Sequence, residues 1–206
     1  ADLAVDEGLR NVEALLEVKR RVAPYLDLQL VAFPQDGVLR YDPRRDDPSC
    51  TLSALQLLEK ALDRGVDVVG GIPHFERTMA DGAESVKLLC EIAAARGLRV
   101  DMHCDESDDP LSRHVETLAF HARRLGLQGR VTGSHLTSMH SMDSYYVSKL
   151  IPLIAEAGLS AISGSIRPRE ERFAISTVGK TASIGPGAWW ITKPIQLFPA
   201  SVAPTC

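Results

Sequence analysis

The feature that most constrains the fold is a regular alternation of two apolar patterns along the first 163 residues. Short continuous apolar runs of strand length alternate with longer stretches in which apolar residues recur at helical spacing. This alternation is typical of βα units around a buried parallel sheet. The predicted strands are Leu28–Phe33, Val66–Ile72, Leu98–His103, Arg130–Leu136 and Leu159–Ser163.

The amphipathic stretches predict helices, and glycines mark several of their ends. Gly65, Gly97, Gly126 and Gly158 each stand just past a helical stretch, where a left-handed residue closes the helix. A spacing of about 30 residues between the last four strands accommodates one strand, one helix and two short loops. The predicted helices are Asp6–Val22, Leu52–Arg64, Ala83–Arg96, Leu111–Leu125 and Met142–Ala157.

Periodicity alone fits either a barrel or an open doubly wound sheet, and the placement of polar residues favours the barrel. Four successive predicted strands end on polar residues, and in a (β/α) barrel the carboxyl ends of the strands carry the chemistry. We therefore expect an α/β fold, a partial TIM-type barrel of about five βα units. The strand-end residues are Gln35, His74, His103 with Asp105 and Glu106, and His135.

The segment Asp101–Pro110 carries the most chemical information. An apolar strand ends there on His103, and imidazole is a common ligand of zinc and iron. Glu106, three residues later, is placed to move protons at a substrate above such a metal. The alternative is a buried structural histidine at a strand end. The acidic pair Asp108 and Asp109 precedes Pro110 and is interpreted as a cap of the next helix.

The other strand-end residues allow both functional and structural interpretations. His135 follows His103 by one βα unit, so it would project toward the same space and hold or polarise a metal-bound water. Gln35 offers a donor and an acceptor for an amide or pyrimidine edge, or it stabilises a turn. His74 follows a proline at the corresponding place, where packing or a hydrogen bond to a site residue is at least as plausible as a direct role in the site. His114 and His121 fall within a helical stretch, where solvent or helix-face roles dominate.

Composition narrows the partners and the compartment. The net charge of −4 comes from 23 basic and 27 acidic residues without a long block of either sign, so we expect a small-molecule partner and no nucleic acid or membrane. There is no apolar run of 18 residues, and the first residues form an acidic amphipathic stretch that does not resemble the basic start and cleavage site of a signal peptide. The cysteines show no C-x-x-C spacing, which favours a reducing, cytoplasmic setting. Phosphate-loop, dinucleotide-binding and nucleophile-elbow motifs are missing from the sequence.

Four motifs in order resemble the cytosine deaminase branch of the amidohydrolase superfamily, and they are also similar to the hydrolases of aminated triazine rings, such as isopropylammelide hydrolase. They are LLEVKRRVAPYLDLQLVAFPQDGVL, VDVVGGIPHFERT, VDMHCDESDDPLSRHVETLA and GRVTGSHLTSMHSMDSYYVSKL. The resemblance implies a TIM-type barrel with one iron or zinc ion that activates water for attack on a ring carbon. It implies that His103 is a metal ligand, Glu106 the proton shuttle, His135 a partner of the metal-bound hydroxide and Gln35 a substrate-binding residue. His74 and Asp105 would contact these site residues without themselves binding the metal or the substrate.

The chain also departs from the family pattern. The resemblance implies two further metal ligands from an H-x-H pair and one from a late Asp, and neither motif occurs here. A metal site normally needs three or more protein ligands, so we expect His103 alone to bind metal poorly. We expect an internal portion of a longer barrel, with residues 1–163 forming the partial barrel and 164–206 a tail of irregular composition.

Two functions follow from these observations. The first is a metal-dependent hydrolase that deaminates cytosine-like or other aminated heterocyclic rings. The second is a catalytically inactive fragment or partner-binding remnant of such a barrel. Five strands cannot close an eight-stranded barrel, so self-association through open sheet edges is a further expectation.

Overall fold

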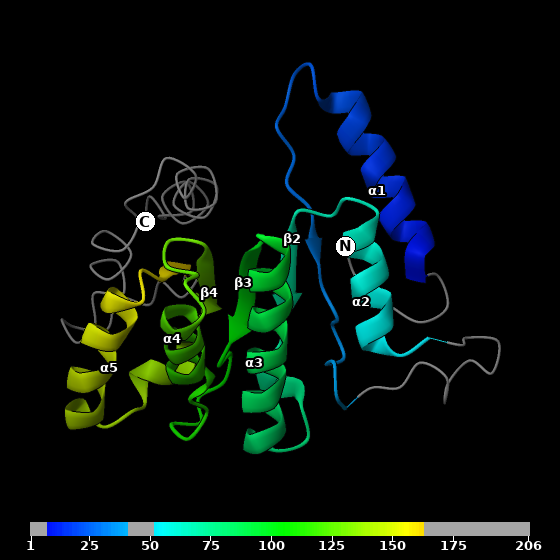
Figure 1. Ribbon diagram of the computed structural model, residues 1–206. Coiled ribbons are helices and arrows are strands. Elements are labelled where there is room, and N and C mark those ends of the chain that lie inside the picture. The colour runs from blue at the N-terminus through cyan, green and yellow to red at the C-terminus, as the bar shows by residue number, and fades with distance from the viewer. Residues whose placement is uncertain (1–7, 41–51, 163–206) are drawn as a thin grey trace, which may run out of the picture. The chain divides into compact units, whose positions relative to one another are not determined.

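The computed structural model describes residues 8–40 and 52–162 (Figure 1). The chain divides into two compact units, Ala1–Met102 and His103–Cys206, and each is considered by itself. The tail predicted at 164–206 lies outside the described residues. Within the described ranges, no helix is long and apolar enough to cross a membrane.

The first unit is built of helices and parallel strands that alternate along the chain. Strands β1 and β2 pair in parallel with Val31 opposite Val68, and β2 pairs in parallel with β3 with Val69 opposite Val100. The elements are α1 Gly8–Val22, β1 Val31–Ala32, α2 Ala54–Asp63, β2 Val68–Gly71, the 3₁₀ helix η2 Pro73–Phe75, α3 Met79–Arg96 and β3 Arg99–Cys104, whose last two residues belong to the second unit.

Strand β2 ends in two glycines because its neighbours leave no room for side chains there. A Cβ at Gly70 would lie 2.8 Å from the backbone oxygen of Ala32. A Cβ at Gly71 would lie 2.6 Å from Cδ1 of Leu89 on α3. All four residues of the strand are buried, as expected for a parallel strand covered on both faces. The Gly-Gly pair therefore allows helix α3 to pack closely on the sheet.

Local capping explains the bounds of the helices in this unit. Ser53 and Gln56 form a capping box at the start of α2. Helix α3 starts four residues before the predicted Ala83, because the Thr78 side chain accepts a hydrogen bond from the Asp81 amide and caps the helix at that point. The same helix ends as predicted at Gly97, which has a φ of 68°.

The second unit continues the alternation. Strands β4 and β5 pair in parallel with Thr132 opposite Ser160, and the Leu136 amide donates to the Cys104 oxygen at the end of β3. Helices α4 and α5 are joined by the Tyr146 hydroxyl, which donates to Glu116 at 2.7 Å. The elements are α4 His114–Arg124, β4 Val131–His135, the 3₁₀ helix η3 Thr137–His140, α5 Ser144–Glu156 and β5 Ser160–Ile162.

The structure confirms the predicted alternation within the described residues. Each predicted strand and each predicted helix is present, with bounds that differ by a few residues. The four predicted capping glycines all have positive φ, as the helix-end interpretation requires. The ends of β1 and β2 lie in the first unit and the ends of β3 and β4 in the second, and the candidate residues of each unit are described separately.

Candidate active site

Three side chains at the end of β3, those of His103, Asp105 and Glu106, differ in how far they are buried. The strand alternates between partly exposed and buried positions, so that Met102 and Cys104 are buried while His103 is partly exposed. Asp105 then takes a φ of 57°, in the left-handed region that few residues other than glycine adopt. After this turn the Asp105 side chain is fully buried and the Glu106 side chain is half exposed.

The backbone at the end of β4 also takes left-handed conformations, as Asp105 does after β3. His135 has a φ of 76° and Leu136 a φ of 52°. The Leu136 amide donates to the Cys104 oxygen at 3.0 Å, and the Ser138 amide donates to the Asp105 oxygen at 3.0 Å. These bonds hold the two strand ends together and compensate for the cost of the left-handed conformations. Strained residues clustered at two adjacent strand ends are typical of functional sites.

His135 lies between the other two predicted site residues of this unit. Its Nε2 is 3.3 Å from Nδ1 of His103, and its Nδ1 is 3.3 Å from Oε1 of Glu106. The two imidazole rings meet edge to face at 73°, with centroids 4.7 Å apart. Both contacts are satisfied together when His135 is protonated on Nδ1 and accepts from His103 through Nε2. The structure therefore brings His103, Glu106 and His135 into one polar row.

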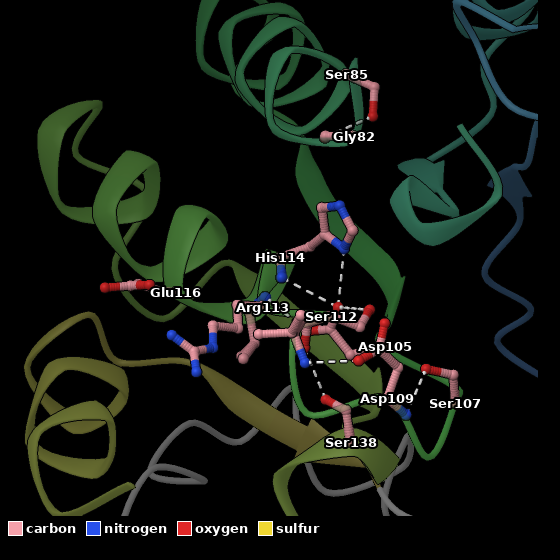
Figure 2. A network of polar contacts seen from close by, with 12 residues as sticks. Gly82, Ser85, Asp105, Ser107, Asp109, Ser112, Arg113, His114, Glu116 and Ser138 are labelled. Atoms are coloured by element: carbon pink, nitrogen blue, oxygen red, sulfur yellow. Dashed lines mark hydrogen bonds and ion pairs between the residues drawn. The ribbon is translucent and has the colours of Figure 1, made fainter. Parts of the chain in front are cut away.

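Asp105 belongs to a different, buried network (Figure 2). Its Oδ1 accepts hydrogen bonds from the Ser112 hydroxyl at 2.7 Å, from the His114 amide at 3.0 Å and from the His114 ring at 2.8 Å. Its Oδ2 accepts from the Val115 amide at 2.9 Å. Burial by itself would raise the pKa of Asp105, but the bonds from His114, Ser112 and Val115 outweigh it and lower the pKa.

This network corrects the interpretation of the following helix. We predicted that Asp108 and Asp109 cap it, but α4 begins at His114 and its N-cap residue Arg113 makes no capping bond. Asp105 accepts from the first two amides of α4 instead, where a carboxylate also opposes the positive end of the helix dipole. Asp109 accepts from the Leu111 amide within the loop.

The two helical histidines are also more buried than predicted. His114 is only 2% exposed and His121 only 8% exposed, so a solvent role is wrong for both. His114 donates through Nδ1 to Asp105, and its Nε2 is the one buried side-chain nitrogen or oxygen without a hydrogen bond among the described residues. The burial of these two histidines is hard to predict from the sequence, because a position in a helix fixes the face on which a side chain lies but not how deeply that face is packed.

Gln35 and His74 belong to the first unit. Gln35 is exposed in a turn closed by the bond from the Gly37 amide to the Pro34 oxygen at 3.0 Å. His74 lies in η2, partly exposed, with its ring edge to face with Phe75. Neither position by itself decides between the functional and the structural interpretation of these residues.

The residue that the sequence analysis missed in this unit is Glu76. Its side chain is 8% exposed, and its two oxygens accept from the consecutive amides of Val38, Leu39 and Arg40. The bonds to Val38 and Arg40 are both 2.7 Å long. The only sequence signal is that Glu76 lies shortly after the second strand, next to the His74 position.

The described residues do not form a complete metal centre. In residues 8–40 and 52–162, no group of three or more His, Cys, Asp or Glu side chains is arranged to hold a metal ion. His103 and His135 face each other through ring nitrogens rather than converging with a third ligand on one point. Tight binding normally requires three or four protein ligands in fixed geometry. The described site therefore does not fit a bound metal by itself.

A family model described as "Amidohydrolase family" matches residues 3–185 of the chain. The chain belongs to the amidohydrolase family. This match extends beyond residue 163, the predicted boundary of the partial barrel. Among curated amidohydrolase relatives, the N-isopropylammelide isopropyl amidohydrolase of Pseudomonas sp. strain ADP is 29% identical over 155 residues. The pterin deaminase of Rhizobium rhizogenes is 35% identical over 75 residues.

Solved amidohydrolase structures share the fold. The 5-methylcytosine deaminase of Klebsiella pneumoniae, liganded with 5-fluorocytosine, matches with a TM-score of 0.73 and 32% identity over 98% of this chain and 53% of that chain. The N-isopropylammelide isopropylaminohydrolase of Burkholderia multivorans matches with a TM-score of 0.70 and 25% identity over 89% of this chain and 44% of that chain. The fold is α/β and corresponds to part of a TIM-type barrel.

The chain covers only part of the proteins that it matches. It aligns with 36% of the Pseudomonas enzyme and 17% of the Rhizobium enzyme, and it spans about half of the Klebsiella structure. The family and the fold follow from these comparisons.

Proposed function

We propose that this chain forms one side of the active site of a hydrolase that deaminates cytosine-like or other aminated heterocyclic rings. The observation that carries the proposal is the row of His103, His135 and Glu106 at two adjacent strand ends, with both contacts at 3.3 Å. Membership of the amidohydrolase family supports it, because the relatives include a pterin deaminase and a 5-methylcytosine deaminase. A small heterocyclic molecule is the partner that this function requires.

The proposed chemistry divides among these residues. Hydrolysis adds water to the ring carbon that bears the amino group, and ammonia leaves as the ring carbonyl forms. Glu106 takes one proton from the attacking water and delivers it to the ring nitrogen, then takes the remaining proton of the added hydroxyl and delivers it to the departing amino group, which its half-exposed carboxylate allows. His135 orients this carboxylate through Nδ1. Gln35 binds the amide-like edge of the ring through its carboxamide.

The remaining site residues have supporting roles in this proposal. Asp105 fixes the loop between His103 and Glu106 through its buried hydrogen bonds. His74 lies in η2, at the end of the neighbouring strand, and supports the loop there. Enzymes of this family generally use a divalent metal ion. We propose His103 as the ligand that this chain would contribute to one ion of iron or zinc.

The decisive experiment compares Glu106→Gln with Asp108→Asn. Both substitutions remove one carboxylate from the same exposed loop, but only Glu106 contacts His135. Ammonia release from cytosine is measured with added iron or zinc. We expect kcat/KM to fall by about 10²- to 10⁴-fold in the Glu106 variant and to change less than about twofold in the control. Equal activity in the two variants would remove Glu106 from the mechanism.

A second function has one observation in its favour. The described residues contain no group of three or more side chains that could hold a metal ion, which fits a catalytically inactive remnant that binds a partner. If the unsubstituted chain releases no ammonia from cytosine and retains no metal after dialysis, the remnant is the better description. Measurable turnover would exclude it.

The two described cysteines bear on the compartment. Cys90 and Cys104 are buried and form no disulfide. Cysteines stay reduced in reducing compartments, so we propose that the protein acts in the cytoplasm. Lysis of cells directly into denaturant with iodoacetamide, followed by mass spectrometry of the cysteine-containing peptides, would test this, since unfolded reduced cysteines would react and disulfide-bonded cysteines would escape the reagent.

A further inference from the structure

The loop that follows β1 is held by a side chain from another loop. Residues 37–40 run past η2, and the carboxylate of Glu76 accepts hydrogen bonds from three consecutive amides there, those of Val38, Leu39 and Arg40. The Arg40 guanidinium donates to the Phe75 oxygen at 2.9 Å and ties the same two loops a second time. All of these contacts lie within the first unit.

The contact is specific for a carboxylate in this position. Both oxygens of Glu76 are occupied as acceptors, and the side chain is only 8% exposed. A carboxylate that accepts several backbone amides makes stronger hydrogen bonds than a neutral side chain would. Gly37 has a φ of 91°, and a Cβ at this residue would lie 3.0 Å from Oε2 of Glu76. The backbone of the loop therefore adapts closely to the carboxylate.

Gln35 stands directly before this anchored segment. The turn from Pro34 to Gly37 is closed by a 3.0 Å hydrogen bond, and its last residue leads straight into the three amides that Glu76 holds. Gln35 itself is exposed. The path of the backbone through the turn therefore sets where its side chain projects.

We infer that Glu76 is the positioning residue of the Gln35 turn and that it presents the Gln35 carboxamide to the heterocyclic ring in one orientation. The inference rests on the proposed function, in which Gln35 binds substrate. Because Gln35 acts in recognition rather than in proton transfer, loss of the anchor should weaken binding and leave the chemical step nearly unchanged. Glu76 has no contact with the reacting atoms in this proposal.

The test uses Glu76→Gln, which keeps the shape of the side chain but replaces one acceptor oxygen by a donor group. Glu91→Gln makes the same change on an exposed position of α3 and is the matched control. Amide hydrogen exchange of residues 38–40 is followed in both variants. We expect exchange about 10- to 100-fold faster in the Glu76 variant and unchanged in the control. Unchanged protection in the Glu76 variant would overturn the inference.

Steady-state kinetics distinguish a positioning role of Glu76 from a general disruption of the fold. With cytosine as the probe, we expect KM to rise about tenfold in Glu76→Gln while kcat changes less than about twofold. Gln35→Ala should raise KM similarly, and the double variant should be no worse than Gln35→Ala, because the two residues act in one unit. Additive effects of the two substitutions, or a fall in kcat alone, would contradict the inference.

The two proposals fail in different ways. If Gln35→Ala raises KM and Glu76→Gln does not, the positioning role is wrong and the proposed function stands. If neither the unsubstituted chain nor any variant binds or turns over cytosine, the proposed function and the substrate part of this inference fail together. The exchange measurement then still decides whether Glu76 holds the turn.

Discussion

At the scale of single residues, the candidate site depends on pairs that are distant in the sequence. His103 and His135 come from successive strands and meet at 3.3 Å, and Glu106 meets the other nitrogen of the same ring. Asp105, between the partly exposed His103 and the half-exposed Glu106, is buried, and its carboxylate caps α4 and binds His114. Adjacent residues therefore differ in their surroundings: Asp105 is buried in a hydrogen-bond network, while Glu106 is open to solvent.

The buried Asp105 network leads to a stability prediction. Asp105→Asn replaces an acceptor oxygen by a donor group that faces other donors, so we expect the free energy of unfolding to fall by about 3 kcal/mol. Urea unfolding followed by circular dichroism measures the change. Asp109→Asn, on an exposed loop position, serves as the control. Similar unfolding midpoints for the two variants would show that the network contributes little.

Cys90 gives a second prediction at this scale. Burial, with a smaller contribution from the charge of Glu91, raises the pKa of the Cys90 thiol to about 12 from an ordinary value of 9.0. This difference lowers the thiolate fraction at pH 8 about a thousandfold, and the thiolate is the reactive form. We expect iodoacetamide to modify Cys90 only after unfolding in urea, as read from the mass of its peptide. Rapid modification in the native protein would show that α3 opens.

At the scale of elements, caps and close contacts fix where helices and strands end. Helix α3 begins earlier than its apolar pattern suggests because Thr78 provides a cap. Strand β2 ends in glycines because the side chain of Leu89 and the backbone of Ala32 occupy the space. Helix α4 receives its cap from Asp105, a residue nine positions before His114. The hydrogen bond from the His114 amide to Asp105 therefore holds the start of α4 next to the loop that carries Glu106.

The capping box of α2 can be tested directly. The Ser53 side chain accepts from the Gln56 amide, and the Gln56 side chain accepts from the Ser53 amide at 2.9 Å. We expect Ser53→Ala to lower the free energy of unfolding by about 1 kcal/mol in denaturant titrations. Ser53→Asp keeps an acceptor at the N-cap and should restore most of the loss. A loss of the same size in both variants would argue against capping as the cause.

At the scale of the whole molecule, the chain spans only part of the length of its relatives. It belongs to the amidohydrolase family, yet it aligns with 36% of the Pseudomonas relative and about half of the Klebsiella structure. The described residues supply His103, His135 and Glu106 but no three-ligand metal site. The expectation of self-association stays a prediction.

Metal retention is the prediction that belongs to this scale. After incubation with zinc or ferrous iron and dialysis, we expect the chain to keep only a small fraction of one ion, because fewer than three fixed ligands bind metal weakly. Elemental analysis gives the stoichiometry, and His103→Ala gives the background. One ion per chain that is lost in the His103 variant would mean that residues outside the described ranges complete the site.

The sequence by itself determined the order of strands and helices and the positions of the strand ends. Apolar periodicity depends on short-range geometry, so the strands ending near His103 and His135 and the glycine at residue 97 were predictable. The resemblance carried by four motifs gave the family. The assignment of Gln35, His103, Glu106 and His135 to catalysis stays a prediction.

Only the tertiary structure decided which polar groups meet. Whether a carboxylate is solvated or buried depends on what packs over it, and this is not encoded in its neighbours along the chain. The structure therefore identifies Asp105 as the cap of α4 and His114 as its buried partner. It also shows that Glu76 binds the amide of Val38, 38 residues earlier in the chain, next to the Gln35 turn. Each of these roles rests on hydrogen bonds between distant segments, which folding alone brings together.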